Sequence, residues 1–293
     1  MNLLAGRWIQ AGPLLAKQWL SLTVALSAVV GWLLYLPQLS TGIFFVFFGT
    51  LLMSGGAAAL NQYQERGLDV LMSRTSDRPI PAGLVGANQA FIFSVILIFT
   101  GVILFAMVGF YKTLVLGLVN IVVYNFIYTN LKTKTQFAVL PGAVVGAIPP
   151  MMGWTAAGGQ IIDLKLFYFA MFIFLWQIPH FWLLMAKNAR DYKKAGFDVI
   201  SNQLEQVRVN RLVFFWAVIS SLYILPMPVF FPKTPTLIVA LIIILNFVFV
   251  FAFYQAIFGA NNAASKNTKA FTIINLYAVA VMLLMVVNSF LSV

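Results

Sequence analysis

The chain of 293 residues contains no cysteine and only one histidine, His180. These absences exclude disulfides, thiolate catalysis and zinc sites built from several His or Cys ligands, so a bound metal ion would need oxygen ligands. Charged residues are also scarce, at 9%, whereas 62% of the residues are hydrophobic. The mean hydropathy of +0.95 is too high for a water-soluble domain of this length, because too few polar residues are present to cover its surface. Most of the chain is therefore expected to lie in lipid.

Long apolar segments divide the whole chain. A membrane-spanning helix needs about 20 mostly apolar residues, and nine such windows lie at 19–36, 43–60, 90–110, 113–130, 137–157, 166–186, 212–231, 236–258 and 271–291. Each window should be helical, because the bilayer offers no partner to unpaired backbone groups. The segment 1–12 lacks the pattern of a cleavable signal peptide. The sequence therefore predicts an all-α, polytopic membrane protein with one domain over 1–293.

The basic residues favour one side of the predicted membrane protein. With nine spans, 15 Lys and Arg residues fall on the side of the N-terminus and three fall on the other side. This asymmetry predicts a cytoplasmic N-terminus and a C-terminus on the opposite face. The net charge of +11 is then explained by orientation and by anionic lipids or ligands, so no nucleic-acid partner is expected. Six of the seven acidic residues lie on the same predicted side, which suggests that this side carries the function.

Three oxygen-bearing side chains follow the second apolar segment at intervals of four. Asn61, Glu65 and Asp69 should share one face of a helix, because each step of four residues turns by only about 40°. Such a set of oxygen atoms suits Mg²⁺, which binds through one or two carboxylates together with substrate phosphates. The alternative is a solvated helix end, in which the carboxylates pair with Arg66 and Arg74.

The segment 73–83 continues from these oxygen ligands. It contains Arg74 and Arg78 before a proline-rich turn, and Arg side chains offer planar donors that fit phosphate oxygens. Either arginine alone could serve only to orient the membrane helices. The loops 61–83 and 187–211 are both long and rich in mixed charge, and two similar halves facing each other would bring these loops together.

Two further features lie within apolar segments. Prolines and glycines at 141–150 either line a cavity or allow close packing of helices, and the sequence does not decide between these readings. His180 lies in the string Trp-Gln-Ile-Pro-His-Phe-Trp at 176–182. A histidine in a membrane helix is a functional candidate, because it must face the protein interior or a wet cavity. A hydrogen bond to a neighbouring helix with a purely structural role is the alternative.

These motifs together resemble the UbiA-type intramembrane prenyltransferase superfamily. The resemblance extends from about Leu51 to the last span and rests on 61–69 with 74–83, on Tyr128, Thr129 and Lys132, on 146–154, and on 176–182 with 191–196. The string around His180 is typical of the branch that transfers farnesyl to protohaem IX. The resemblance implies nine helices around a central cavity that opens to the cytoplasmic side.

The resemblance also implies roles for individual residues. Glu65, Asp69 and Asp191 would hold Mg²⁺, and Asn61 would orient this end of the site. The residues expected to bind the substrates are Arg74, Arg78, Lys132, Tyr128, Lys187, Tyr192 and His180. For His180 two roles stay open, as an axial ligand of haem iron or as a donor to a haem propionate.

The implied reaction moves a farnesyl group from farnesyl diphosphate to a vinyl group of haem B, giving haem O and diphosphate. The implied partners are these two substrates, membrane lipid and components of haem A synthase or a terminal oxidase, in a bacterial inner membrane. The alternatives are a prenyltransferase that acts on a quinone precursor and a membrane transporter. A transporter would carry charges along a path through the bilayer, whereas here, apart from His180, they gather at one face.

The chain departs from the pattern of the haem branch in two places. Glu65 stands where the family usually has Asp, which keeps an oxygen ligand on a longer side chain. After Gly196, the residues Phe197-Asp198-Val199-Ile200-Ser201 replace the usual Ile-Pro-Met-Leu-Pro. The loss of both prolines is expected to change the stiffness of this loop.

Overall fold

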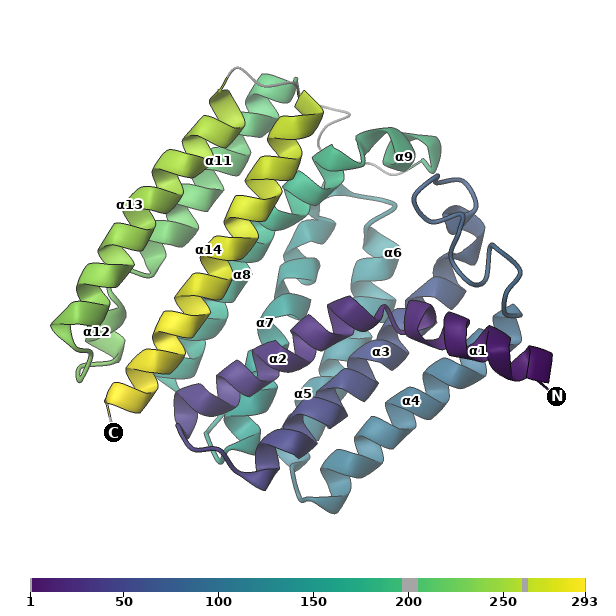
Figure 1. The fold of residues 1–293 in the computed structure, drawn as a ribbon, viewed down its shortest axis with the longest axis horizontal. Helices are drawn as coiled ribbons and strands as arrows, with labels where there is room; N and C mark the ends of the chain where they lie inside the picture. The colour runs from purple at the N-terminus through teal and green to yellow at the C-terminus, as the bar shows by residue number, and fades with distance from the viewer. Residues whose placement is uncertain (1, 197–204, 260–262, 293) are drawn as a thin grey trace.

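A computed structural model describes residues 2–196, 205–259 and 263–292, which contain helices and turns and no strand (Figure 1). The all-α prediction is therefore confirmed for these residues. The helices of the first half are α1 (Asn2–Leu15), α2 (Gln18–Tyr35), α3 (Thr41–Asp69), α4 (Ala87–Met107), α5 (Tyr111–Ile121), a π-helix η1 (Val122–Tyr128) and α6 (Thr129–Leu131). The second half contains η2 (Gln136–Ala138), α7 (Val139–Ala156), α8 (Leu164–Lys187), α9 (Ala189–Lys194), α11 (Gln206–Tyr223), α12 (Met227–Phe230), α13 (Thr236–Phe258) and α14 (Ala263–Leu291).

The protein is an integral membrane protein. Among the described residues, eight helical segments are long and apolar enough to cross a bilayer. The predicted span at 212–231, the seventh of the nine, falls largely on α11, which packs in the bundle against α8 and α13 but is not among those eight. Its first two turns contain Arg208 and Arg211. The apolar part of α11 is therefore shorter than that of its neighbours, and the prediction of about nine spans is close.

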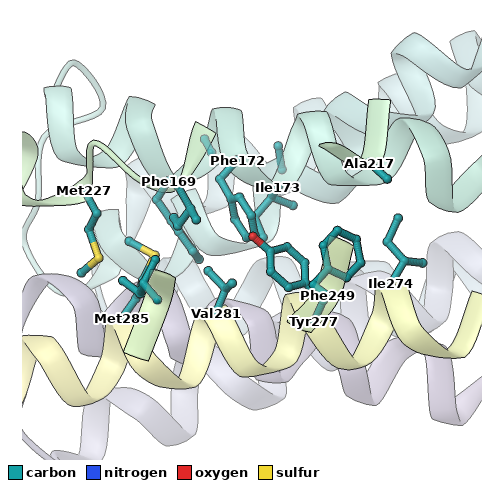
Figure 2. Packing of buried hydrophobic residues seen from close by; sticks show 14 of the residues in the cluster. Phe169, Phe172, Ile173, Ala217, Met227, Phe249, Ile274, Tyr277, Val281 and Met285 are labelled. Atoms are coloured by element: carbon teal, nitrogen blue, oxygen red, sulfur yellow. The ribbon is translucent and has the colours of Figure 1, made fainter. Parts of the chain in front are cut away.

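The bundle closes because the last helix meets the first part of the chain. Helix α14 packs against α13, α8 and α2, and α2 in turn packs against α3 and α7 (Figure 1). Buried aromatic side chains fill the space between α8, α13 and α14, and Tyr277 stacks on Phe249 with ring centroids 4.0 Å apart (Figure 2). The hydroxyl of Tyr277 donates to Oδ1 of Asn246, so this buried polar group has a partner.

Small residues let α2 and α7 approach closely. A Cβ atom at Gly153 would overlap the carbonyl oxygen of Ala28, and a Cβ atom at Gly31 would overlap that of Pro150. Helix α7 continues through Pro149 and Pro150. Of the two readings left open for the proline- and glycine-rich segment, these contacts support close helix packing.

A π-helical turn interrupts the helix formed by α5 and α6. The residues 122–128 make i to i+5 hydrogen bonds, a local geometry that often occurs at functional sites. Its Asn125 donates to the carbonyl oxygen of Ala57 and to Oε1 of Gln64 on α3, at 3.0 and 3.1 Å. The turn is therefore fixed to the helix that carries the predicted oxygen ligands.

The glycine contact between α2 and α7 predicts a large effect of one added methyl group. Gly153→Ala should destabilise the folded protein by about 1 to 3 kcal/mol, because backbone atoms of α2 would have to shift. Gly67→Ala on α3 is the matched control: its Cβ would meet nothing within 4 Å, and alanine favours a helix by up to about 1 kcal/mol. The midpoint of thermal unfolding in detergent measures both changes. Equal midpoints for the two variants would contradict the close contact.

Candidate active site

The three predicted oxygen ligands lie on one buried face of α3. Asn61, Glu65 and Asp69 are exposed by only 1%, 5% and 0%. The four-residue spacing therefore gave the correct shared face. Buried carboxylates require compensating charges, because an isolated charge away from water is very costly.

Each carboxylate has a cationic partner from another segment. Nζ of Lys132 lies 2.5 Å from Oε1 of Glu65, and Nη1 of Arg78 donates to both carboxylate oxygens of Asp69 at 2.8 Å. Arg66 instead donates to the carbonyl oxygen of its neighbour Tyr63. The alternative of a solvated helix end, in which the carboxylates pair with Arg66 and Arg74, is therefore wrong for Arg66. Burial lowers the pKa of the Lys132 ammonium, and Glu65 opposes this shift.

Lys17 completes the cluster, although it was not among the residues selected from the sequence. Its Nζ donates to Oδ1 of Asn61 at 2.9 Å and lies 3.5 Å from the hydroxyl of Tyr124. Burial lowers the pKa of Lys17 to about 7, and the charges of Arg78 and Lys132 lower it further. The residue has φ 44°, a left-handed conformation that only a few per cent of non-glycine residues adopt, and it lies at the junction of α1 and α2. A lysine just before the first span can be explained by membrane orientation alone, so its position in the sequence did not indicate a role in the site.

Aromatic rings connect this cluster to His180. Tyr128 stacks on Tyr124 at 5.9 Å, Lys132 lies 5.5 Å from the centre of the Tyr128 ring, and Phe181 lies 5.8 Å from Tyr128 on the other side. The ring of Phe181 in turn lies 5.6 Å from that of His180, edge to face. Phe181 was missed as a candidate, because its closeness to Tyr128 depends on the packing of both α8 and the π-helix against α7.

The two charged loops meet, as their similarity predicted. Oδ1 of Asp191 accepts a hydrogen bond from the hydroxyl of Ser73 at 2.7 Å, and Oδ2 accepts one from the backbone N–H of Arg74 at 3.1 Å. The hydrogen bond from Ser73 lowers the pKa of the Asp191 carboxyl. The guanidinium of Arg74 lies 5.9 Å from the centre of the Tyr192 ring. Helix α9 therefore holds the segment that carries Arg74 and Arg78 (Figure 1).

Asp191 does not gather with the carboxylates of α3 in this arrangement. Within 2–196, 205–259 and 263–292, no three His, Asp or Glu side chains form a group able to hold a metal ion. The changed segment Phe197-Asp198-Val199-Ile200-Ser201 lies outside the described residues. The role of Asp191 as a metal ligand stays a prediction.

His180 and Lys187 both contact residues of the last helix, α14. Nδ1 of His180 is 3.0 Å from Oδ1 of Asn275 on α14, so the histidine is hydrogen-bonded to a neighbouring helix. The ring of Phe271 lies 4.9 Å from the His180 ring and 5.8 Å from Nζ of Lys187. The cluster around the α3 carboxylates and the pair of His180 and Lys187 therefore form two groups, which the ring contacts of Tyr128 and Phe181 connect.

Comparison with known proteins agrees with this arrangement. The sequence pattern of the UbiA prenyltransferase family matches residues 19–279. The chain belongs to the UbiA prenyltransferase family. Its similarity to a protohaem IX farnesyltransferase of Nitratidesulfovibrio vulgaris reaches 35% identity over 226 residues, which cover 77% of this chain and 79% of the relative. A protein of the same name from Geobacter sulfurreducens is 36% identical over 209 residues, covering 71% and 77% of the two chains.

Solved UbiA structures share the fold. A digeranylgeranylglyceryl phosphate synthase superposes with a TM-score of 0.76 at 16% identity, covering 96% of this chain and 98% of the other. A UbiA homologue from Archaeoglobus fulgidus, solved with GPP and Mg²⁺, gives 0.72 at 14% identity and covers 96% and 99%. At sequence identities this low, the similarity to these two structures concerns the fold alone.

The donor atoms of this UbiA member fit a magnesium ion. Glu65 and Asp69 supply two carboxylates on one face of α3, and Asn61 adds an amide oxygen. Hard oxygen donors of this kind suit Mg²⁺, which takes few protein ligands and completes its shell with water and substrate phosphates. Lys17, Lys132 and Arg78 surround the same face. Such a set of cations suits the remaining oxygens of an anionic group.

The ion pair between Glu65 and Lys132 predicts a measurable coupling. Lys132→Met should destabilise the protein by about 3 kcal/mol, because it leaves a buried carboxylate unpaired. Adding Glu65→Gln should recover most of this loss, since neither partner is then charged. The exposed Lys134 is the control, and Lys134→Met should change little. Unfolding of the wild type, Lys132→Met, Glu65→Gln and the double variant in detergent gives the coupling energy, and equal effects of Lys132→Met and Lys134→Met would refute it.

Proposed function

We propose that this protein transfers the farnesyl group of farnesyl diphosphate to a vinyl group of haem B, forming haem O and diphosphate. The observation that carries the proposal is the identity of 35% over 77% of the chain with a protohaem IX farnesyltransferase. The two residue groups support it, because the reaction needs one site for a strongly anionic diphosphate and another for a flat acceptor. The single histidine belongs to the second group.

The diphosphate belongs beside the buried face of α3. Glu65 and Asp69, with Asn61 next to them, would hold Mg²⁺, and the bound ion would offset charge on the diphosphate as a Lewis acid. Lys132 and Arg78, which are paired with these carboxylates, would contact phosphate oxygens as well. The backbone of Arg74 is hydrogen-bonded to Asp191. Arg74 would therefore approach the diphosphate from the same loop as Arg78.

Lys17 adds a cation that can gain a proton. With a pKa of about 7, the buried amine is charged in only part of the molecules near neutral pH. A diphosphate in contact with it would favour the ammonium form, because an opposite charge nearby stabilises the charged state. Donors that are already fixed at the position where leaving-group charge develops lower the barrier to ionisation.

The chemistry begins with cleavage of the bond between C1 of farnesyl and the diphosphate oxygen. The diphosphate leaves with the electron pair, and C1 becomes an allylic cation. The π electrons of a haem vinyl group then form a carbon–carbon bond to C1, which leaves a cation on the vinyl carbon next to the pyrrole. Water adds to that carbon and loses a proton, giving the hydroxyethylfarnesyl group of haem O.

Tyr128 and Phe181 are placed to protect the cation. Their rings lie between the diphosphate group of residues and His180, 5.8 Å apart. Aromatic faces attract cations and exclude water, so a cation at this position would be stabilised until the vinyl group reaches it. His180 and Lys187 would contact the haem, with the ammonium of Lys187 suited to a propionate. Tyr192, beside Arg74, would contact a substrate from α9.

The end of the bundle with these residues is proposed to face the cytoplasm of a bacterial cell. The segments 69–86, 131–136 and 188–196 contribute to that end and carry much of the positive charge. Positive residues favour the cytoplasmic side. The membrane would hold the farnesyl chain, while the diphosphate enters from water.

Product formation tests the proposal directly. Purified protein with Mg²⁺, haem B and farnesyl diphosphate should give a farnesylated haem by mass spectrometry, and an aromatic quinone precursor in place of haem should give no product. Asp69→Asn should lower turnover at least about 100-fold, because transition-state charge loses its support. Glu65→Asp should be tolerated, and the exposed Asp77→Asn is the control. A prenylated quinone precursor without farnesylated haem would overturn the choice of acceptor.

The two subsites should respond separately to substitution. His180→Ala should weaken haem binding while leaving Mg²⁺-dependent binding of a non-hydrolysable farnesyl diphosphate analogue intact. Arg78→Ala should do the reverse, because Arg78 is bound to Asp69 on the diphosphate side. Haem absorbance titration and analogue binding measure the two affinities. Equal loss of both ligands in folded His180→Ala protein would contradict separate subsites.

A further inference from the structure

The ring of His180 is held by one amide of the last helix. Nδ1 of His180 lies 3.0 Å from Oδ1 of Asn275, and Nδ2 of Asn275 donates to the carbonyl oxygen of Phe271 at 2.5 Å. The second bond fixes which way the amide points, since a carbonyl oxygen accepts only from the NH₂ group. The amide oxygen of Asn275 must therefore face the imidazole.

This arrangement determines where the histidine proton lies. An amide oxygen cannot donate, so Nδ1 of His180 must carry the proton of the bond. A neutral imidazole has one N–H, and its other nitrogen then has a free lone pair. Within the part of the chain that the structure describes, Nε2 of His180 has no hydrogen bond. His180 as a whole is only partly buried.

The same turn of α14 also fixes the neighbour of His180 on α8. Nε1 of Trp176 donates to the carbonyl oxygen of Ile274 at 2.9 Å, one residue before Asn275. The rings of Trp176 and Phe271 lie 5.0 and 4.9 Å from the imidazole and limit its rotation. Two hydrogen bonds and two rings therefore set both the tautomer and the orientation.

We propose that Asn275 is a positioning residue that presents Nε2 of His180 to the iron of the haem acceptor. This inference rests on the proposed function and favours one of the two roles left open for His180. A lone pair at Nε2 of the neutral imidazole can bind iron directly, whereas a hydrogen bond to a propionate would first require a proton on Nε2. Histidines that bind metals usually donate their other N–H to an oxygen, which fixes the tautomer and increases the basicity of the ligand.

Haem titration of the intact protein tests the proposal. The wild-type protein should give a histidine-ligated haem spectrum that is lost in His180→Ala and restored by added imidazole. Asn275→Leu, of similar size but without an acceptor, should weaken haem binding about tenfold or more and lower the iron–histidine stretching frequency in the Raman spectrum. Asn275→Asp keeps an oxygen acceptor with more charge, so it should raise that frequency.

Two controls separate the orientation of His180 from a general loss of structure. Thr272→Val removes a side-chain hydrogen bond on the exposed face of α14 and should leave the spectrum unchanged. Binding of the farnesyl diphosphate analogue should be the same in all variants. An unchanged frequency in Asn275→Leu, or a wild-type spectrum in His180→Ala, would overturn the proposal while farnesylation of haem still stands. A wild-type protein that binds no haem B would overturn both.

Discussion

The burial of two carboxylates on α3 imposes the main constraint on this fold. A charge removed from water needs a partner of opposite sign, and removing one partner costs more than the pair contributes. Glu65 and Asp69 receive theirs from Lys132 and Arg78, which lie after the fourth span and in the loop after the second. Lys17 adds a third cation through Asn61. These contacts bring three distant segments to one end of the bundle.

The second half of the molecule depends on hydrogen bonds between α8 and α14. These helices enclose an apolar core in which the hydroxyl of the buried Tyr277 is paired with Asn246. Trp176 and His180 both use atoms of α14 as acceptors. The aromatic pair of Tyr128 and Phe181 joins this half to the ionic cluster. In the proposed reaction, departure of the diphosphate would thus take place at the ionic cluster, and the cation would react beside the aromatic rings.

Much of the fold and part of the site could be predicted from the sequence, for reasons that particular residues make clear. The shared face of Asn61 and Asp69 follows from the helical period alone, so spacing was enough. The contact of Asp191 with Ser73 agrees with the expectation that the similar loops 61–83 and 187–211 lie together. Lys17 and Asn275 could not be found in this way, because their partners come from tertiary packing and their sequence positions have ordinary explanations. The prediction of nine spans rather than eight depended on the segment 212–231, because the apolar part of α11 is short.

The place of Asn275 on the last helix has a consequence for the order of synthesis. Every residue of the ionic cluster, from Lys17 to Lys132, and α9 with Asp191 precede α14 in the chain. A nascent chain can therefore assemble its anion-binding region while the imidazole of His180 still lacks the group that orients it. Only when the final span has entered the bilayer and closed against α8 and α2 does the acceptor side become complete. During translation, anion binding should thus precede the capacity to hold the flat acceptor.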